Sequence, residues 1–335
     1  MKDLIIPKGY QSKLDLLETE IAIKFVKDTF ERELAKALNL TRVSAPLFIF
    51  PSTGLNDNLN GHERRVTFDI KDIYEEVEVV QSLAKWKRNA LALYGFKCDS
   101  GLYTDMNAIR RDEDLDTIHS AYVDQWDWER IISREDRNIN YLKKTVRAIY
   151  RVIRNVQEKV SKRYPNIENK LPKNIQFITT KQLEAMYPDM LPKERELAAS
   201  KKYGAVFIMQ IGGKLRNGLP HDGRAADYDD WSLNGDIIVY YEELDLAFEL
   251  SSMGIRVDEE TIVKQLKERK EEDKMKNKYV QDVINKRLPL TIGGGIGQSR
   301  LCMYMLKKAH IGEVQASVWS PEDIEYLKEN NIFLL

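Results

Sequence analysis

Residues 290–306 read Leu-Thr-Ile-Gly-Gly-Gly-Ile-Gly-Gln-Ser-Arg-Leu-Cys-Met-Tyr-Met-Leu, an apolar approach that meets four glycines and leaves as a helix. Without side chains at these glycines, backbone N–H groups and the helix start can approach an anion closely. A dinucleotide fingerprint would need glycine where Arg300 stands, and a P-loop would need a Gly-Lys-Ser/Thr sequence that is absent here. We therefore predict a tight strand-to-helix turn, which carries either a plain surface arginine or an anion-binding one.

The composition is that of a globular protein without strong charge. The 335 residues, 43% of them hydrophobic, suffice for one large or two ordinary domains. Lys and Arg total 52 against 53 Asp and Glu, and a net charge of −1 gives no general attraction to nucleic acid or to an anionic membrane. The only cysteines, Cys98 and Cys302, form no disulfide or zinc pattern. With no apolar run near the ~18 residues of a membrane span, we expect a soluble cytoplasmic protein.

The spacing of apolar residues predicts most of the secondary structure. A long amphipathic helix over residues 12–40 begins with Ser12 and Asp15 as a capping box. Pro46 favours an edge strand over residues 43–50, at a dimer edge or a pocket rim. The remaining expected elements are a hairpin of residues 66–70 and 77–79, a helix at 133–163, strands at 174–179 and 205–211 around a helix at 193–203, an exposed helix at 263–287 and a last strand at 314–319.

A shorter helix follows Ser82, which we expect to be its cap, and Gly95 closes it. Lys85, Lys87 and Arg88 fall off the apolar stripe of this helix. Such cations usually form a solvated face, whereas a helix that begins beside a substrate pocket directs one of them inward. Both interpretations stay open for these three side chains.

Two neighbouring strands carry polar side chains on one face. Residues 101–110 alternate so that Arg110 shares a side with Thr104, and residues 119–129 place Gln125 and Asp127 on the same face as His119. Burying an amide and a carboxylate unpaired beside an arginine is costly. We therefore interpret this face as the floor of a site.

Two loops are rich in carboxylates. The turn-rich segment 51–61 presents Asp57 either to a ligand or, as an Asx-turn, to solvent. Residues 220–236 hold five aspartates and one arginine, and we expect them to form a loop before a strand at 237–241. Acidic loops are most often solvated. Alternatively, carboxylates from this loop and from the strand-like segment around Glu249 share a magnesium ion carried by a nucleotide.

Six blocks of the sequence resemble the ammonia-dependent asparagine synthetases, in the order of that family and over nearly the whole chain. They are Gly54-Leu55-Asn56-Asp57-Asn58-Leu59, Ser82-Leu83-Ala84-Lys85-Trp86-Lys87-Arg88, Tyr122-Val123-Asp124-Gln125-Trp126-Asp127-Trp128-Glu129, Asp227-Tyr228-Asp229-Asp230-Trp231, Glu249-Leu250-Ser251-Ser252-Met253-Gly254-Ile255-Arg256 and residues 293–300. The resemblance implies an α+β fold, with an antiparallel sheet flanked by helices as in the catalytic core of class II aminoacyl-tRNA synthetases. It also implies a homodimer with one catalytic domain over residues 1–335 and no anticodon-binding domain.

The resemblance assigns roles to individual residues. Arg110 corresponds to the arginine that contacts the α-phosphate, and Asp57 and Gln125 complete the catalytic set. The residues that correspond to substrate-binding positions are Ser82, Lys87, Asp127, Ser251, Ser252 and Arg256. Those that correspond to nucleotide-binding positions are Arg224, Asp229, Asp236, Glu249, Gly295 and Arg300, with Asp236 and Glu249 near the magnesium ion of ATP.

The implied substrates are L-aspartate, ammonia and ATP, with no nucleic-acid or membrane partner. Aspartate attacks the α-phosphate of ATP, and ammonia rather than glutamine then attacks the β-aspartyl adenylate. Two departures stand out: only Leu233 separates Ser232 from Asn234, where the family has a longer loop, and His62 follows Gly61 where the family has a cysteine. The alternatives are an aminoacyl-tRNA synthetase core, a paralogue with another acceptor, and a non-catalytic protein that binds asparagine or nucleotide.

Overall fold

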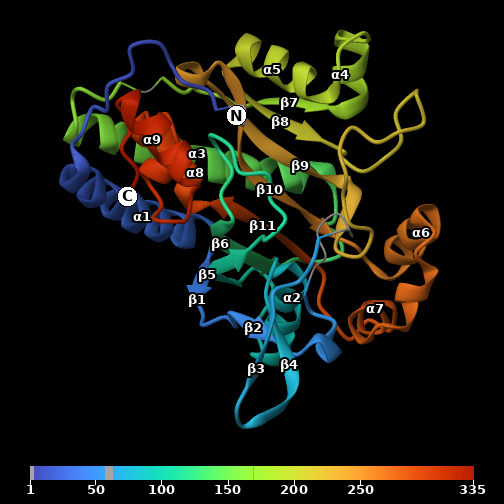
Figure 1. Cartoon of the computed structure of the whole chain (residues 1–335). Helices are drawn as coiled ribbons and strands as arrows, with labels where there is room; N and C mark the ends of the chain where they lie inside the picture. The colour runs from blue at the N-terminus through green and yellow to red at the C-terminus, as the bar shows by residue number, and fades with distance from the viewer. Residues whose placement is uncertain (1–3, 57–62, 169) are drawn as a thin grey trace.

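The computed structural model describes residues 4–56, 63–168 and 170–335, and its centre is a sheet of eight strands (Figure 1). The six inner strands run antiparallel to one another, while each of the two outermost strands pairs in parallel with the strand beside it. In spatial order the strands are β1 (Leu40–Arg42), β5 (Gly101–Ile109), β6 (Tyr122–Ile131), β11 (Thr291–Gly297), β10 (Leu246–Arg256), β9 (Asp229–Tyr241), β8 (Ala205–Met209) and β7 (Gln176–Thr179). The predicted fold class, an antiparallel sheet flanked by helices, is confirmed.

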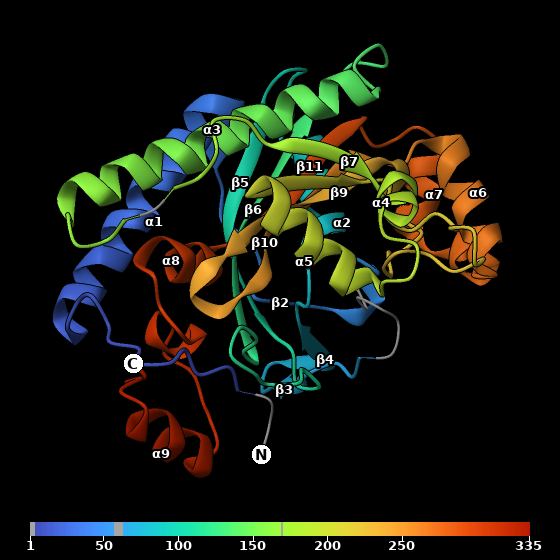
Figure 2. The same cartoon turned by 90° about the horizontal axis from the view of Figure 1, so that it is seen from above.

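Helices cover both faces of this sheet. On one face α1 (Leu16–Leu38) and α3 (Ile139–Arg163) run side by side, and α8 (Gln298–Leu306) packs with them (Figure 2). On the other face lie α2 (Ala84–Leu93), α4 (Thr180–Met186) and α5 (Pro192–Tyr203). Beyond the sheet are α6 (Glu259–Arg269), α7 (Lys278–Ile284) and α9 (Pro321–Glu329), and a second small sheet of β2 (Phe48–Ile49), β4 (Ile73–Val79) and β3 (Thr67–Ile70).

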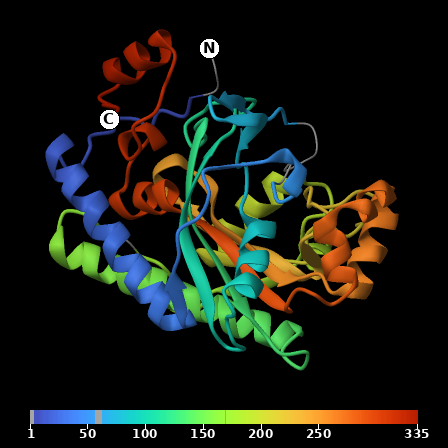
Figure 3. The same ribbon diagram turned by 90° about the horizontal axis from the view of Figure 1, so that it is seen from below.

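The alternation in β6 separates the hydrophobic core from the predicted site floor. Trp126 and Trp128 are fully buried toward the α1 side, where the ring of Phe30 lies 4.7 Å from that of Trp126. Gln125 and Asp127 point to the opposite face, because successive residues of a strand point to opposite sides. Figure 3 shows α2 lying across this second face. The prediction of two distinct faces for this strand is confirmed.

The glycine stretch is a strand and not a turn, which corrects the prediction. Gly293 and Gly295 lie within β11, paired with β6 and β10, and their φ angles are not positive. A Cβ atom on Gly293 would fall 1.9 Å from Glu129 Oε2, and one on Gly295 would fall 2.2 Å from Gln125 Oε1. The glycines therefore make room for polar side chains of the neighbouring strand.

The N-terminal predictions need two corrections. The cap of α1 is Asp15, which accepts a hydrogen bond from the N–H of Glu18 at 2.8 Å, and not Ser12. Residues 43–47 around Pro46 form no strand, and β1 and β2 belong to different sheets. The predicted hairpin is confirmed as β3 and β4.

Further along the chain, three segments differ from expectation. The strand expected at 237–241 begins already at Asp229, so residues 229–236 are part of β9 and not a loop. Residues 263–287 form α6, a 3-10 turn and α7, which bury Ile262, Leu266 and Val283 against Trp231. Residues 314–319 form no strand. Across the described ranges, every helix is too short or too polar to traverse a lipid bilayer.

Candidate active site

A cavity of about 320 Å³ opens between α2 and the ends of the four central strands β5, β6, β11 and β10. Most of the residues predicted for the site line it, although they come from segments far apart in the sequence. They are Ser82, Lys87, Arg110, Gln125, Asp127, Asp229, Glu249, Ser251, Ser252, Arg256, Gly295 and Arg300. Asp57 lies outside the described residues.

Arg256, on β10, is held by two carboxylates. Its Nε donates to Glu129 Oε1 at 3.0 Å and its Nη2 to Glu129 Oε2 at 2.8 Å, while Nη1 donates to Asp229. Burial raises the pKa of Glu129, but the Arg256 and Lys87 charges outweigh it, so the pKa lies below its ordinary value. The guanidinium is thus fixed in one orientation in a dry part of the cavity.

Lys87 is buried on the face of α2 that points toward the sheet. Its position decides between a solvated and an inward direction for the cations of this helix. Lys87 Nζ donates to the carbonyl of Gly294 at 3.1 Å and lies 3.3 Å from Asp127 Oδ1. Burial lowers its pKa, although Asp127 and Glu129 favour the charged form. Lys85 and Arg88 are buried as well: Lys85 lies 2.6 Å from Asp227, and Arg88 donates to the carbonyls of Pro289 and Val257. The expected solvated face is therefore wrong for all three.

Arg110 directly follows β5 and faces the cavity mouth. Its backbone N–H donates to the carbonyl of Ala121 at 2.8 Å, which extends the pairing with β6 by one residue. Its Nη1 lies 3.6 Å from Glu113 Oε2, and its buried Nε has no hydrogen-bond partner among the described residues. A guanidinium placed in this way keeps donors free for an anionic ligand.

Asp236 and Glu249 form an acidic pair beside the cavity. Asp236 forms an ion pair with Arg224. Neither Asp236 nor Arg224 lines the cavity, whereas Glu249 does. Burial and the charge of Glu249 raise the pKa of Asp236 to about 7 against the effect of Arg224, and among the described residues its buried Oδ1 has no hydrogen-bond partner. These carboxylate oxygens fit a magnesium ion that a nucleotide carries. Within the described ranges no group of three or more His, Cys, Asp or Glu side chains converges on a metal site.

The glycine-rich strand and the helix after it complete the cavity wall. Arg300 Nη1 donates to the carbonyl of Glu249 at 3.2 Å, so the arginine of this motif lies beside the acidic pair. Ser251 and Ser252 line the wall from β10, and the buried Oγ of Ser251 has no hydrogen-bond partner in the part of the chain that the structure describes. Ser82 lines the cavity before α2, where its Oγ accepts from the N–H of Ala84 at 3.2 Å although Leu83 occupies the cap position.

Several residues of the site were not predicted. Glu129 lies on the same face of β6 as Asp127, so the alternation itself was the missed signal. Asp124, from the opposite face, accepts hydrogen bonds from the N–H of Ser299 and from Gln315, and pairs with Lys27 at 3.0 Å. His119, which the alternation had placed on the site face, has its Nδ1 2.8 Å from its near neighbour Asp116, and this orients the ring at the cavity mouth. The partners of Glu129 and Asp124 come from distant segments, and local sequence does not indicate them.

Comparisons with known proteins agree with this geometry. Residues 17–331 match the model of a family described as aspartate–ammonia ligase. An aspartate–ammonia ligase of Ruminiclostridium cellulolyticum is 60% identical over 336 residues, covering all of both chains, and that of Fusobacterium nucleatum is 61% identical over 98% of this chain and all of the other. A crystal structure of Pyrococcus horikoshii asparaginyl-tRNA synthetase complexed with asparaginyl-adenylate shares the fold with a TM-score of 0.66 and 14% identity, over 90% of this chain and 70% of the other. The chain therefore belongs to the aspartate–ammonia ligase family, and it is a ligase built on the catalytic fold of the class II aminoacyl-tRNA synthetases.

Proposed function

We propose that the protein makes L-asparagine from L-aspartate, ammonia and ATP through a β-aspartyl adenylate, with AMP and pyrophosphate as the other products. The observation that carries this proposal is the convergence of two sets of side chains on one cavity. Lys87, Asp127 and Arg256 offer charges of both signs for an amino acid, and Arg110 and Arg300 offer donors for phosphates. A substrate with an amino group and two carboxylates needs such a mixed set.

In the first step the β-carboxylate of aspartate attacks the α-phosphate of ATP, and pyrophosphate leaves. Arg256 and Lys87 hold the carboxylates of aspartate, while Asp127, Ser82, Ser251 and Ser252 offer acceptors and hydroxyls for its polar groups. Arg110 stabilises the negative charge that develops on the α-phosphate, since a preorganised donor in a water-poor site acts most strongly where charge appears. Magnesium bound to ATP near Asp236 and Glu249 would neutralise phosphate charge.

The remaining assignments concern the nucleotide. Arg224, Asp229, Asp236, Glu249, Gly295 and Arg300 surround it in this proposal. Arg224 and Asp236 are not part of the cavity lining, and they act through their ion pair, which lies beside Glu249. Gly295 provides the space in which the Gln125 amide lies next to the reacting acyl group.

In the second step ammonia attacks the acyl carbon and AMP leaves. Ammonium, the main form near neutral pH, is not nucleophilic, so a group has to accept its proton. We assign this role to Asp57 on the resemblance alone, and Gln125 orients the acyl group and stabilises its oxyanion. Glutamine as nitrogen donor would need a thiolate and a general base. Cys302 is buried in α8, where burial raises the pKa of its thiol to about 12.

We also infer a cytoplasmic homodimer. Leu16, Leu17 and Ile21 expose apolar side chains along the first turns of α1, which supports a contact with a second copy there. The free Cys98 on the surface is in keeping with a reducing compartment. Sedimentation velocity at micromolar concentration tests the dimer, and a fully active monomer would refute it.

The test of the function is a complete reaction. Purified protein, ATP, magnesium and aspartate are supplied with ammonium chloride, and in parallel with ammonia-free glutamine or with tRNA. We expect asparagine and AMP in equal amounts from ammonium chloride alone. Sustained turnover on glutamine would overturn the choice of nitrogen donor, and aminoacylated tRNA would favour a synthetase instead.

A further inference from the structure

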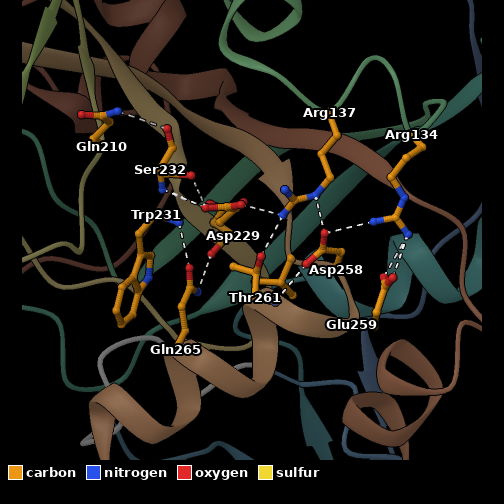
Figure 4. A network of polar contacts seen from close by, with 12 residues as sticks. Arg134, Arg137, Gln210, Asp229, Trp231, Ser232, Asp258, Glu259, Thr261 and Gln265 are labelled. Atoms are coloured by element: carbon orange, nitrogen blue, oxygen red, sulfur yellow. Dashed lines mark hydrogen bonds and ion pairs between the residues drawn. The ribbon is translucent and has the colours of Figure 1, made fainter.

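Arg137 joins two segments behind the cavity wall. It precedes α3, and its side chain is only 12% exposed. Its Nη2 donates to Asp230 Oδ2 at 2.5 Å. The same Nη2 donates to Thr261 Oγ1 at 3.2 Å, while Nε lies 3.3 Å from Asp258 Oδ2 (Figure 4). One guanidinium therefore contacts the start of β9 and the start of α6 together.

The substrate-facing pair Asp229 and Arg256 lies next to these contacts, at the start of β9 and the end of β10. Asp230 follows Asp229, and because successive strand residues point to opposite faces, Asp230 meets Arg137 behind the wall while Asp229 meets Arg256 in front of it. Asp258 comes two residues after Arg256. The pairing of β9 with β10 shifts register between Gly254 and Arg256, so this end of the ladder is irregular.

The two carboxylates that Arg137 binds are themselves fixed. Asp230 accepts from the N–H of Ser232 at 2.9 Å and from its hydroxyl at 2.6 Å. Asp258 caps α6 by accepting from the N–H of Thr261 at 2.9 Å. Burial raises the pKa of Asp258, but the Thr261 hydrogen bond and the charges of Arg137 and Arg134 bring it below its ordinary value. Both carboxylates are thus held in place by their own hydrogen bonds when Arg137 binds them.

We infer that Arg137 is a positioning residue for the aspartate site: by binding Asp230 and Asp258 at once, it fixes Asp229 relative to Arg256. This inference rests on the proposed function, in which Arg256 binds a carboxylate of aspartate. One planar guanidinium makes this bridge, because its Nη2 donates to Asp230 and to Thr261 while its charge lies beside Asp258, and a lysine ammonium cannot reproduce that shape. Displacing a substrate-holding group by a fraction of an ångström is enough to weaken binding and catalysis.

The chain offers a matched control in Arg134. Its side chain is 50% exposed and pairs with Asp258 at 3.1 Å and with Glu259 at 3.0 Å, both on the α6 side of the network. Arg134→Gln therefore removes a similar charge from the same network but leaves the connection between β9 and α6 in place. Arg256→Lys serves as a second reference, because it changes the proposed substrate-binding residue itself.

The experiment compares Arg137→Gln, Arg137→Lys, Asp230→Asn, Arg134→Gln and Arg256→Lys in aspartate-dependent exchange of pyrophosphate into ATP. For both Arg137 variants and for Asp230→Asn we expect the KM for aspartate to rise about tenfold, while the KM for ATP stays within about twofold. Arg134→Gln should resemble the unchanged protein. A purely structural role would lower the amount of folded enzyme, and so kcat, without changing the KM for aspartate.

The outcomes distinguish the positioning role of Arg137 from the assignment of Arg256 to the aspartate site. Unchanged KM for aspartate in the folded variants of Arg137 and Asp230, with a raised KM in Arg256→Lys, would overturn the positioning role alone. An unchanged KM in Arg256→Lys would overturn the assignment of the aspartate site. Since Asp230→Asn keeps the size and the Ser232 contacts of the side chain, it remains informative if Arg137→Gln does not fold.

Discussion

Glu129 and Arg256 are joined by two parallel hydrogen bonds, Nε to Oε1 at 3.0 Å and Nη2 to Oε2 at 2.8 Å, and Lys87 Nζ lies 4.0 Å from the same carboxylate. Both side chains are buried, so water cannot replace either of them as a hydrogen-bond partner of the other. The carboxylate therefore sets the direction of a guanidinium and also balances two cations.

Removing this carboxylate should affect both stability and substrate binding. Glu129→Gln leaves Arg256 and Lys87 in a dry environment with one fewer counter-charge, and breaking a buried ion pair in this way costs about 3–5 kcal/mol. We expect a clearly lower free energy of unfolding in urea and a higher KM for aspartate. Glu158→Gln is the control, because Glu158 pairs with Arg154 on the exposed side of α3. Equal stability of the two variants would show that the Glu129 charge is not needed.

Arg110→Ala should abolish activity without unfolding the protein. Arg110 makes one long ion pair and lies at the cavity mouth, so its loss opens no cavity in the core. We expect aspartate-dependent pyrophosphate exchange to fall by about 10²–10³-fold, as for the loss of one preorganised donor. The exposed neighbour Arg111 provides the control, Arg111→Ala. Exchange that persists in folded Arg110→Ala would remove Arg110 from the catalytic set.

Gly295→Ala tests the space that the glycine-rich strand provides. The added Cβ would lie 2.2 Å from Gln125 Oε1 and 2.8 Å from Asp127 Oδ1, so Gln125 must leave its position. We expect kcat for asparagine formation to fall by at least about tenfold. In Gly213→Ala, the control, the new Cβ meets nothing within 4 Å. Unimpaired turnover in Gly295→Ala would mean that the position of Gln125 is not critical.

His310 should make the protein less stable in mild acid. Burial lowers its pKa from 6.5 to about 4, while Nδ1 accepts a hydrogen bond from the N–H of Gly312. Between those two values the unfolded chain takes up a proton that the folded protein does not, so stability is lost as the pH falls below 6.5. From pH 7.5 to 5.0 this loss amounts to about 2 kcal/mol.

The matched variant for this pH effect is His310→Asn, which retains an acceptor for the N–H of Gly312 but does not titrate. Urea unfolding at pH 7.5 and pH 5.0 measures the difference directly. The variant should lose about 2 kcal/mol less than the unchanged protein between the two pH values. The same loss in both proteins would mean that other groups account for the acid sensitivity.

The site floor could be predicted from sequence because it depends on local alternation. In β6 the tryptophans 126 and 128 point into the core, and this alone places Gln125 and Asp127 on the other face. The same rule extends to Glu129. What it cannot give is the partner of Glu129, because Arg256 is 127 residues away along the chain.

Some features could not be decided from local sequence because they depend on long-range packing. Lys87 resembles a solvated cation by its place on the helix, and only the docking of α2 over β6 and β11 brings it to Asp127 and to the carbonyl of Gly294. The glycines of β11 have the composition of a turn. Glycine is needed at Gly293 and Gly295 because the Glu129 and Gln125 side chains lie too close for a Cβ atom, and local sequence does not reveal this. The early start of β9 similarly depends on the pairing of Asp229 with Arg256.

The central claim is that the β-carboxylate of aspartate is activated as an adenylate, and an oxygen label tests it most directly. Aspartate with ¹⁸O in its side-chain carboxylate is converted to asparagine with ammonium chloride and unlabelled ATP, and the products are analysed by mass spectrometry. If the carboxylate attacks the α-phosphate and ammonia then displaces AMP from the acyl carbon, one labelled oxygen appears in AMP and none in pyrophosphate. Label in pyrophosphate or in inorganic phosphate, with AMP unlabelled, would contradict the proposed mechanism.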